Sequence, residues 1–346
     1  MVIIRADGNE HIGAGHIMRC LSIAEEIKKI DICVVFVMAD GQFESTIKER
    51  GFETLVLYSD YSDMRSEEQM VIEYLKEVKP TAMIVDSYYV TPQYLEKLRK
   101  ITNLIYIDDR MEFAYDVDML INYNVFARES LYGDLYGNCD IEKPQLLLGT
   151  SFVPLRKQFL NSRIFVRENV SDILVSSGAT DTQHVEKRLM ECLLQEKKML
   201  KKYRFHFVVG KLNSDYETLK ELAGADENLC IYYNVNDMKS LMCLCEVAIS
   251  AAGSTLYELC ACGIPTITYS FADNQIPAER EFATRGLMLS VGDIRDNHRY
   301  IDQIMKCLDI LINNHQMRVD MSANAFELVD GKGAMRIAEY VLKDRN

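Results

Sequence analysis

The sequence predicts an α/β protein made of two doubly wound halves, each with a parallel sheet covered by helices. Short apolar runs rich in Val and Ile alternate with amphipathic segments over most of the 346 residues. These runs are nearly continuous in hydrophobicity, which is typical of strands buried on both faces. The alternation starts again after a polar, charged segment at 156–169, so we expect two domains, at 1–158 and 159–346.

The first half is expected to contain seven strands and four helices. The strands are predicted at 2–4, 32–38, 54–57, 82–85, 104–107, 119–121 and 145–148. Helical periodicity falls between them at 17–28, 42–50, 66–78 and 91–101, the last with Pro92 in a favoured first-turn position. This strand–helix alternation predicts a Rossmann-like domain.

The second half repeats the alternation without any sequence repeat. Its strands are predicted at 172–175, 204–209, 229–232, 247–249, 266–269 and 287–290. Its helices are predicted at 182–196, 237–245, 255–262, 275–284, 301–313, 315–328 and 333–343. With two Rossmann-like halves, a ligand is expected in a cleft between them, at the carboxyl ends of both sets of strands.

Composition narrows the classes of partner. The formal net charge of −13 argues against binding to DNA or RNA, although local backbone N–H groups can still hold the phosphates of a nucleotide. No apolar run approaches the ~18 residues of a membrane span, and the start of the chain lacks the pattern of a signal peptide. The ten cysteines are scattered, which favours buried, reduced thiols in a cytoplasmic protein over disulfides or a metal site.

A glycine turn precedes the first helix. Gly13 and Gly15 allow the backbone to turn tightly and approach a ligand, and His16 then lies at or just before the helix N-terminus. Free N–H groups there favour an anion, and the positive helix end disfavours imidazolium, so a neutral His16 can act as a base near pH 7. The alternative is a tight turn with a capping histidine, because glycine turns of this kind are weak indicators of function.

Two loops of the second half have the composition of phosphate-binding turns. One carries Gly178 and the other carries Gly253 and Ser254, each between a strand and a helix, and together they suit a diphosphate. Glu258, one turn into the following helix, can accept hydrogen bonds from two ribose hydroxyls, or it is simply an exposed or capping glutamate. Asn274 and Gln275 suit sugar hydroxyls or amides, and a helix-capping role is compatible with that.

Polar residues also end three strands of the first half, at 86–89, 108–110 and 122–124. Such positions face the ligand site of a doubly wound sheet. The Asp108–Asp109 pair suggests a metal site, but no third ligand is evident, and a turn or capping role is the favoured interpretation.

With these motifs in place, the chain resembles the UDP-sugar hydrolases of pseudaminic acid biosynthesis, over nearly its whole length. That family is related to spore-coat polysaccharide proteins and, in fold, to GT-B glycosyltransferases, so the resemblance implies a GT-B-like fold. The segments that carry it are 5–7, 13–20, 86–88, 107–109, 122–124, 155–156, 250–258, 273–275 and 329–334.

The resemblance implies hydrolysis of UDP-2,4-diacetamido-2,4,6-trideoxy-β-L-altropyranose without metal or cofactor, with His16 as the general base. It places Gly253 and Ser254 at the diphosphate, Glu258 at the ribose, and Asn274 and Gln275 at the sugar. Further substrate contacts are implied for Asp7, Gly13, Gly15, Arg19, Tyr88, Asn124, Arg156 and Gly178. The expected partners are this small molecule and other enzymes of the pathway, with neither nucleic acid nor membrane.

Two other functions remain open. A glycosyltransferase of the same fold would use a sugar hydroxyl in place of water and would require an acceptor. A non-catalytic protein would bind the nucleotide sugar without turnover. Neither the sugar stereochemistry nor the oligomeric state follows from the sequence.

Overall fold

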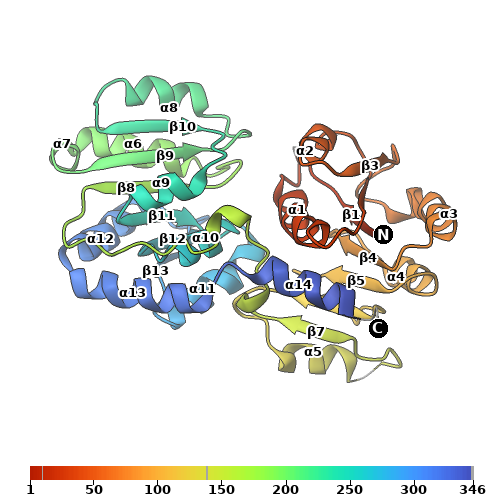
Figure 1. The fold of residues 1–346 in the computed structure, drawn as a ribbon. Coiled ribbons are helices and arrows are strands. Elements are labelled where there is room, and N and C mark those ends of the chain that lie inside the picture. Colours follow the sequence, from red (N-terminus) through yellow and green to blue (C-terminus); the bar gives the residue numbers. More distant parts are fainter. Residues whose placement is uncertain (10, 138, 344–346) are drawn as a thin grey trace. The chain divides into compact units, whose positions relative to one another are not determined.

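A computed structural model describes residues 1–343 except Glu10 and Asn138 (Figure 1). The described chain forms two compact units. The first contains residues 1–156 and the segment that starts at Gly331, and the second is the continuous stretch Lys157–Asp330. The chain therefore leaves the first unit once and returns to it near its end.

The first unit is built on a seven-stranded parallel sheet with strand order β3-β2-β1-β4-β5-β6-β7. In this order the chain moves outward from β1 to one edge and then continues from β4 to the other, which is the Rossmann arrangement. Ile3 of β1 is paired with Val35 on one side and with Met83 on the other. The strands are β1 (Val2–Ala6), β2 (Val34–Met38), β3 (Glu53–Val56), β4 (Ala82–Asp86), β5 (Leu104–Ile107), β6 (Met119–Asn122) and β7 (Gln145–Leu148).

Helices cover this sheet where the sequence predicts them, with one addition. The α4 helix begins as expected from its cap, because Thr91 accepts a hydrogen bond from the Tyr94 N–H and Pro92 follows at the first helical position. The unpredicted helix is α5, which buries Tyr132 and Tyr136. The helical segments are α1 (Gly15–Lys28), α2 (Glu44–Glu49), η1 (Met64–Ser66), α3 (Glu68–Val78), α4 (Pro92–Arg99), α5 (Glu129–Tyr136), η2 (Thr150–Phe152) and α14 (Gly333–Leu342).

The second unit has a six-stranded parallel sheet with the equivalent order, β10-β9-β8-β11-β12-β13. Its strands are β8 (Asp172–Ser176), β9 (Arg204–Val209), β10 (Leu229–Tyr233), β11 (Val247–Ala251), β12 (Thr266–Ser270) and β13 (Leu289–Asp293). Its helices are η3 (Lys157–Phe159), α6 (Val185–Gln195), α7 (Lys197–Leu200), α8 (Tyr216–Ala223), α9 (Met238–Leu244), α10 (Thr255–Cys262), η4 (Asp273–Gln275), α11 (Ile276–Thr284), α12 (Tyr300–Asn313) and α13 (His315–Leu328). The prediction of two parallel, Rossmann-like sheets is confirmed. None of the described helices combines the length and the apolar character needed to span a membrane.

The predicted division at 158/159 needs one correction. The units meet at Arg156–Lys157, and the last helix, expected in the second half, belongs to the first. There α14 packs against α1 and against the short turn η2, as its position among the first unit's elements shows (Figure 1). Local periodicity predicted the helix correctly but carries no information about which sheet it covers.

Gly333 allows α14 to begin in close contact with the chain after η2. A Cβ atom at this position would lie 2.5 Å from the Val153 backbone nitrogen and 2.6 Å from the Phe152 carbonyl carbon. We expect Gly333→Ala to lower the free energy of unfolding by about 1–3 kcal/mol, since backbone cannot move aside as a flexible side chain can. Gly133→Ala is the matched control, because Gly133 lies in α5 with open space around it and should gain about 0.4–1 kcal/mol. Urea denaturation of both variants measures the difference, and equal effects would contradict the close packing.

Candidate active site

The glycine turn of the first unit directs His16 into the protein. After β1, the Asn9 Oδ1 atom accepts hydrogen bonds from the N–H groups of His11 and Ile12, at 2.9 and 3.0 Å. Gly13 has a φ of +76°, which favours glycine, and its N–H donates to the Asn9 carbonyl. The α1 helix then begins at Gly15, so His16 is its second residue.

His16 is buried, with only 4% of its surface exposed. Its Nδ1 atom lies 3.7 Å from the Asp86 Oδ1 atom, and the Tyr88 ring meets the imidazole edge to face at 4.4 Å. Among the described residues, neither ring nitrogen has a hydrogen-bond partner. Buried polar atoms are nearly always paired in proteins, so these two nitrogens are free for a water or a ligand.

Burial lowers the pKa of His16 below its ordinary value of 6.5. The Asp86 carboxylate acts in the opposite direction, and the Arg19 guanidinium reinforces the lowering. The imidazole is therefore neutral at pH 7 and can accept a proton.

Arg19 connects several strand ends of the first unit. Its Nε and Nη2 atoms donate to the two Asp86 oxygens at 2.6 and 2.5 Å, and Nη1 donates to Asp109 at 2.7 Å and to the Tyr123 hydroxyl at 2.5 Å. Asn124 donates to the other Asp109 oxygen at 3.1 Å. One arginine thus contacts the last residue of β4 and residues that follow β5 and β6.

The bidentate contact with Arg19 settles the charge of Asp86. Burial alone would raise the pKa of Asp86, but the charge and hydrogen bonds of Arg19 act against it, so its pKa is lowered and the carboxyl remains ionised. The Cys20 thiol also donates to Asp86, at 3.4 Å. Asp86 therefore presents a fixed negative charge to the imidazole.

The structure brings together four of the predicted site residues. Asp86 and Asp109 connect His16, Arg19 and Asn124, and Tyr88 packs against His16. Asp86, Asp109 and Tyr123 belong to the strand-end segments expected to face the ligand, but no substrate contact was predicted for any of them. Their position at strand ends was the available signal, since side chains at the carboxyl ends of adjacent parallel strands meet at one edge.

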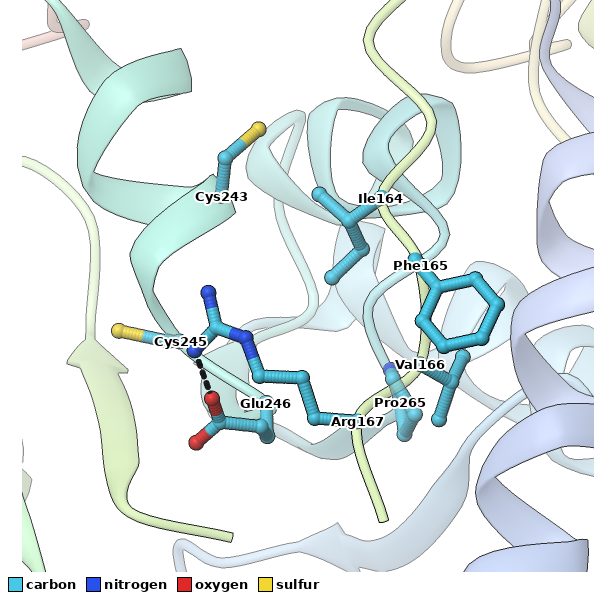
Figure 2. A pocket seen from close by; sticks show the side chains of 8 residues that line it. All are labelled: Ile164, Phe165, Val166, Arg167, Cys243, Cys245, Glu246 and Pro265. Carbon is cyan, nitrogen blue, oxygen red and sulfur yellow. Dashed lines mark hydrogen bonds and ion pairs between the residues drawn. The ribbon is translucent and has the colours of Figure 1, made fainter. Parts of the chain in front are cut away.

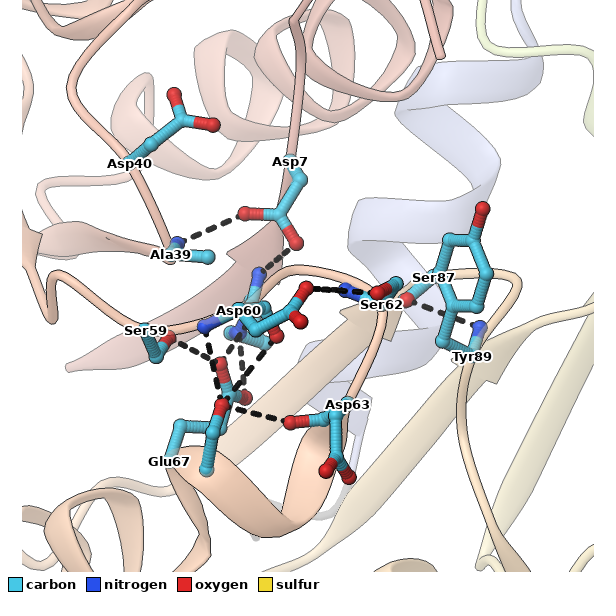
Figure 3. Close-up of polar contacts among 12 residues, drawn as sticks. Asp7, Ala39, Asp40, Ser59, Asp60, Ser62, Asp63, Glu67, Ser87 and Tyr89 are labelled. Atoms are coloured by element: carbon cyan, nitrogen blue, oxygen red, sulfur yellow. Dashed lines mark hydrogen bonds and ion pairs between the residues drawn. The ribbon is translucent and has the colours of Figure 1, made fainter. Parts of the chain in front are cut away.

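Asp7 follows β1 and contacts the loop after β2. Its Oδ1 atom accepts a hydrogen bond from the Ala39 N–H at 2.8 Å (Figure 3). Its Oδ2 atom is 2.6 Å from the Arg5 guanidinium. Asp7 is 3% exposed. The substrate contact predicted for Asp7 stays a prediction.

Asp108 forms a turn, as its favoured interpretation predicted. It accepts hydrogen bonds from the N–H groups of Arg110 and Met111 at 2.8 and 2.9 Å, and from the hydroxyls of Tyr115 and Tyr132 at 3.0 and 2.6 Å. In the part of the chain that the structure describes, no three His, Cys, Asp or Glu side chains lie close enough to hold a metal ion.

The loop after β8, the first predicted phosphate-binding loop of the second unit, is held by hydrogen bonds to neighbouring side chains. Gly178, with a φ of +89°, follows β8. The N–H of the preceding Ser177 donates to Glu186 at 2.8 Å, and the Ser177 hydroxyl is 2.7 Å from that of Tyr269. A Cβ on Gly210 would lie 2.5 Å from the Ala179 carbonyl oxygen, so a glycine after β9 lets the two loops meet.

The second loop of this unit is more open. Gly253 has no other atom within 4 Å of where a Cβ would lie, and Ser254 is exposed at the start of α10. Glu258 is half-buried one turn further on. The Gln275 Oε1 atom accepts a hydrogen bond from the Phe271 N–H at 2.9 Å, while Asn274 is exposed beside it.

Arg156, for which a substrate contact was also predicted, is the last residue of the first unit before the second unit begins.

Two curated proteins resemble this chain at low identity. One is the spore coat polysaccharide biosynthesis protein SpsG of Bacillus subtilis, 22% identical over 99% of this chain and 97% of that protein. The other is a UDP-2,4-diacetamido-2,4,6-trideoxy-beta-L-altropyranose hydrolase of Campylobacter jejuni, 24% identical over 74% of this chain and 86% of that protein. No protein-family model matches the chain.

Among solved structures, MurG of Acinetobacter baumannii superimposes with a TM-score of 0.69, covering 99% of both chains at 13% identity. The fold is GT-B-like. This agrees with the expectation from the sequence, and the two relatives support a relationship to the proteins of spore-coat polysaccharide biosynthesis and to the hydrolases of this UDP-sugar.

Proposed function

We propose that this chain hydrolyses UDP-2,4-diacetamido-2,4,6-trideoxy-β-L-altropyranose to UDP and the free diacetamido sugar. The observation that carries the proposal is the buried, neutral His16, whose two ring nitrogens have no partner among the described residues. A histidine in that state is suited to take a proton from water. The low-identity hydrolase of Campylobacter jejuni supports the choice of substrate.

In the proposed reaction, His16 removes a proton from a water molecule as its oxygen attacks the anomeric carbon. A C–O bond forms to water, the anomeric C–O bond to the β-phosphate breaks, and UDP leaves with the bonding electrons. The reaction turns His16 into an imidazolium beside Asp86, 3.7 Å away. That carboxylate favours the charged form, so it stabilises the developing positive charge.

We assign UDP binding to the second unit. Gly253 and Ser254 precede α10, whose start has no side-chain cap, and the positive end of a helix dipole favours an anion such as a diphosphate. Glu258 is proposed to accept hydrogen bonds from the ribose hydroxyls, and Asn274 and Gln275 to contact the sugar. This assignment rests on the loop composition and on the family resemblance.

The direct test is release of UDP from this nucleotide sugar in the absence of any acceptor. Release that continues in the presence of EDTA supports a metal-independent hydrolase. If EDTA stops the release, the reaction requires a metal ion, and activation of water by His16 alone is wrong.

A glycosyltransferase is the second candidate, because solved structures of this fold include a glycosyltransferase from Rickettsia africae and the glycotransferase of kitacinnamycin. A transferase would give UDP only when an acceptor is added. A protein that binds the nucleotide sugar tightly and releases no UDP under either condition would instead be a non-catalytic binder.

The proposal makes a prediction about pH. His16 must be neutral to act as a base, and its pKa is lowered below 6.5. The rate constant kcat/KM should therefore be constant near neutral pH and fall only as the pH drops through a midpoint below 6.5. Asp86→Asn removes a charge that raises the pKa of His16, so this midpoint should move to still lower pH while kcat falls. A midpoint above 6.5 in the wild type would contradict the assignment of His16.

A further inference from the structure

A cavity of about 270 Å³ lies in the second unit, and none of the proposed substrate-binding residues lines it. The segment 164–167 and Pro265 form one side of it. Cys243, Cys245 and Glu246 form the other, where the chain passes from α9 to β11 (Figure 2).

The charged groups of this cavity are already paired. Arg167 forms an ion pair with Glu246 across the cavity (Figure 2). The other Glu246 oxygen accepts hydrogen bonds from the N–H groups of Ser171 and Asp172, both at 2.8 Å. A charged ligand would have to break these contacts, so the reactive groups left in the cavity are its thiols.

The two thiols of this cavity differ in character. Cys245 is buried, which raises its pKa well above the ordinary value, and its sulfur points away from Cys243 (Figure 2). Cys243 is half-buried, and a hydrogen bond from Cys262 lowers its pKa to about 7. Among neighbouring charges, Lys239 lowers the pKa of Cys243 further and Asp237 opposes it. Cys243 is therefore more nucleophilic than Cys245, since the thiolate is the reactive form of cysteine.

Cys262 is held beside Cys243 by the ends of two helices. It is the last residue of α10 and is fully buried. The Cys243 sulfur lies 3.7 Å from the Ser162 carbonyl oxygen, and the Ser162 hydroxyl donates to the Ala261 carbonyl at 2.8 Å. Ser162 thus connects the end of α9 to the end of α10 and keeps the two sulfur atoms in hydrogen-bonding contact.

We propose that Cys243 and Cys262 form an oxidisable dithiol, a modification site whose co-reactant is hydrogen peroxide or a small organic peroxide. The Cys243 thiolate attacks the peroxide, the O–O bond breaks, and Cys243 becomes a sulfenic acid while hydroxide (or alkoxide) leaves. The Cys262 sulfur then attacks the Cys243 sulfur. An S–S bond forms, the S–O bond breaks, and the oxygen leaves as water with the thiol proton. The two sulfurs lose two electrons and the peroxide gains them.

The test is treatment of the full-length protein with limiting hydrogen peroxide, followed by digestion without reductant and mass spectrometry. We expect one cross-linked pair of peptides, joining Cys243 to Cys262 and lighter by two hydrogen atoms. In Cys262→Ser the sulfenic acid on Cys243 has no thiol to react with, so dimedone should label it.

Cys33→Ser is the matched control, because Cys33 is exposed and lies in the first unit. It should leave the Cys243–Cys262 cross-link unchanged. The proposal is overturned if Cys243 remains a free thiol while Cys33 and Cys139 are oxidised, or if Cys243 is linked to any other cysteine. The wild-type peptide map decides this even if Cys262→Ser fails to fold.

Discussion

Replacing His16 with alanine is expected to slow UDP release by roughly 10²–10⁴-fold, the usual contribution of a general base. The imidazole makes no hydrogen bond to any described residue, so its removal takes away the proton acceptor without breaking a polar network. We expect kcat to fall while the affinity for UDP, followed by calorimetry, stays within a few-fold of the wild type, because UDP binding is assigned to the second unit.

His298→Ala is the control for this variant. His298 is exposed in the second unit and belongs to none of the proposed machinery, so its replacement should leave kcat unchanged. Full activity in His16→Ala would remove the proposed base. Equal losses of activity and UDP affinity would instead mean that His16 supports binding or folding rather than proton transfer.

The largest effect on stability is expected at Glu67. Its two oxygens accept hydrogen bonds from Arg5 at 2.7 and 2.6 Å, and from Tyr94 and Ser59 at 2.8 and 3.2 Å (Figure 3 shows Glu67 beside Ser59). Arg5 and Glu67 are both fully buried. Glu67→Ala leaves a buried guanidinium with Asp7 as its remaining charged partner, and should lower the free energy of unfolding by about 3–5 kcal/mol.

The neighbouring Glu68→Ala provides the comparison. Glu68 pairs with Lys97 at 2.6 Å at the surface, where ion pairs contribute only about 0–1 kcal/mol. Chemical denaturation of the two variants, measured under the same conditions, gives the difference. If adjacent glutamates gave similar losses, the buried network would not be the source of the stability.

The strands of this fold could be predicted because most are short apolar runs rich in β-branched residues, although β7 is rich in leucine instead. The α5 helix was missed because it has only eight residues, with Gly133 in its middle. Its signal was the pair of tyrosines at 132 and 136, one helical turn apart, which face the core. The place of α14 could not be predicted, because an amphipathic pattern shows that a face is buried but not against what.

For the site, the sequence indicated His16 and the polar residues at strand ends, but not the hydrogen bonds that join these residues. Arg19 and Asp86 are separated by 67 positions in the chain, and only the register of the sheet brings them together. The pairing of Cys243 with Cys262 was missed for the same reason. Cys243 and Cys262 lie in two different predicted helices, and neither segment by itself shows that the ends of these helices meet.

The return of α14 to the first unit has a consequence for how the chain is made. A ribosome synthesises residues 1–156 first, yet the helix that packs against α1 is encoded after the entire second unit. The second unit is continuous in sequence and can fold as soon as residue 330 has emerged. The half that is synthesised first is therefore the last to be completed, and until then the apolar surface that α14 covers must be shielded in another way.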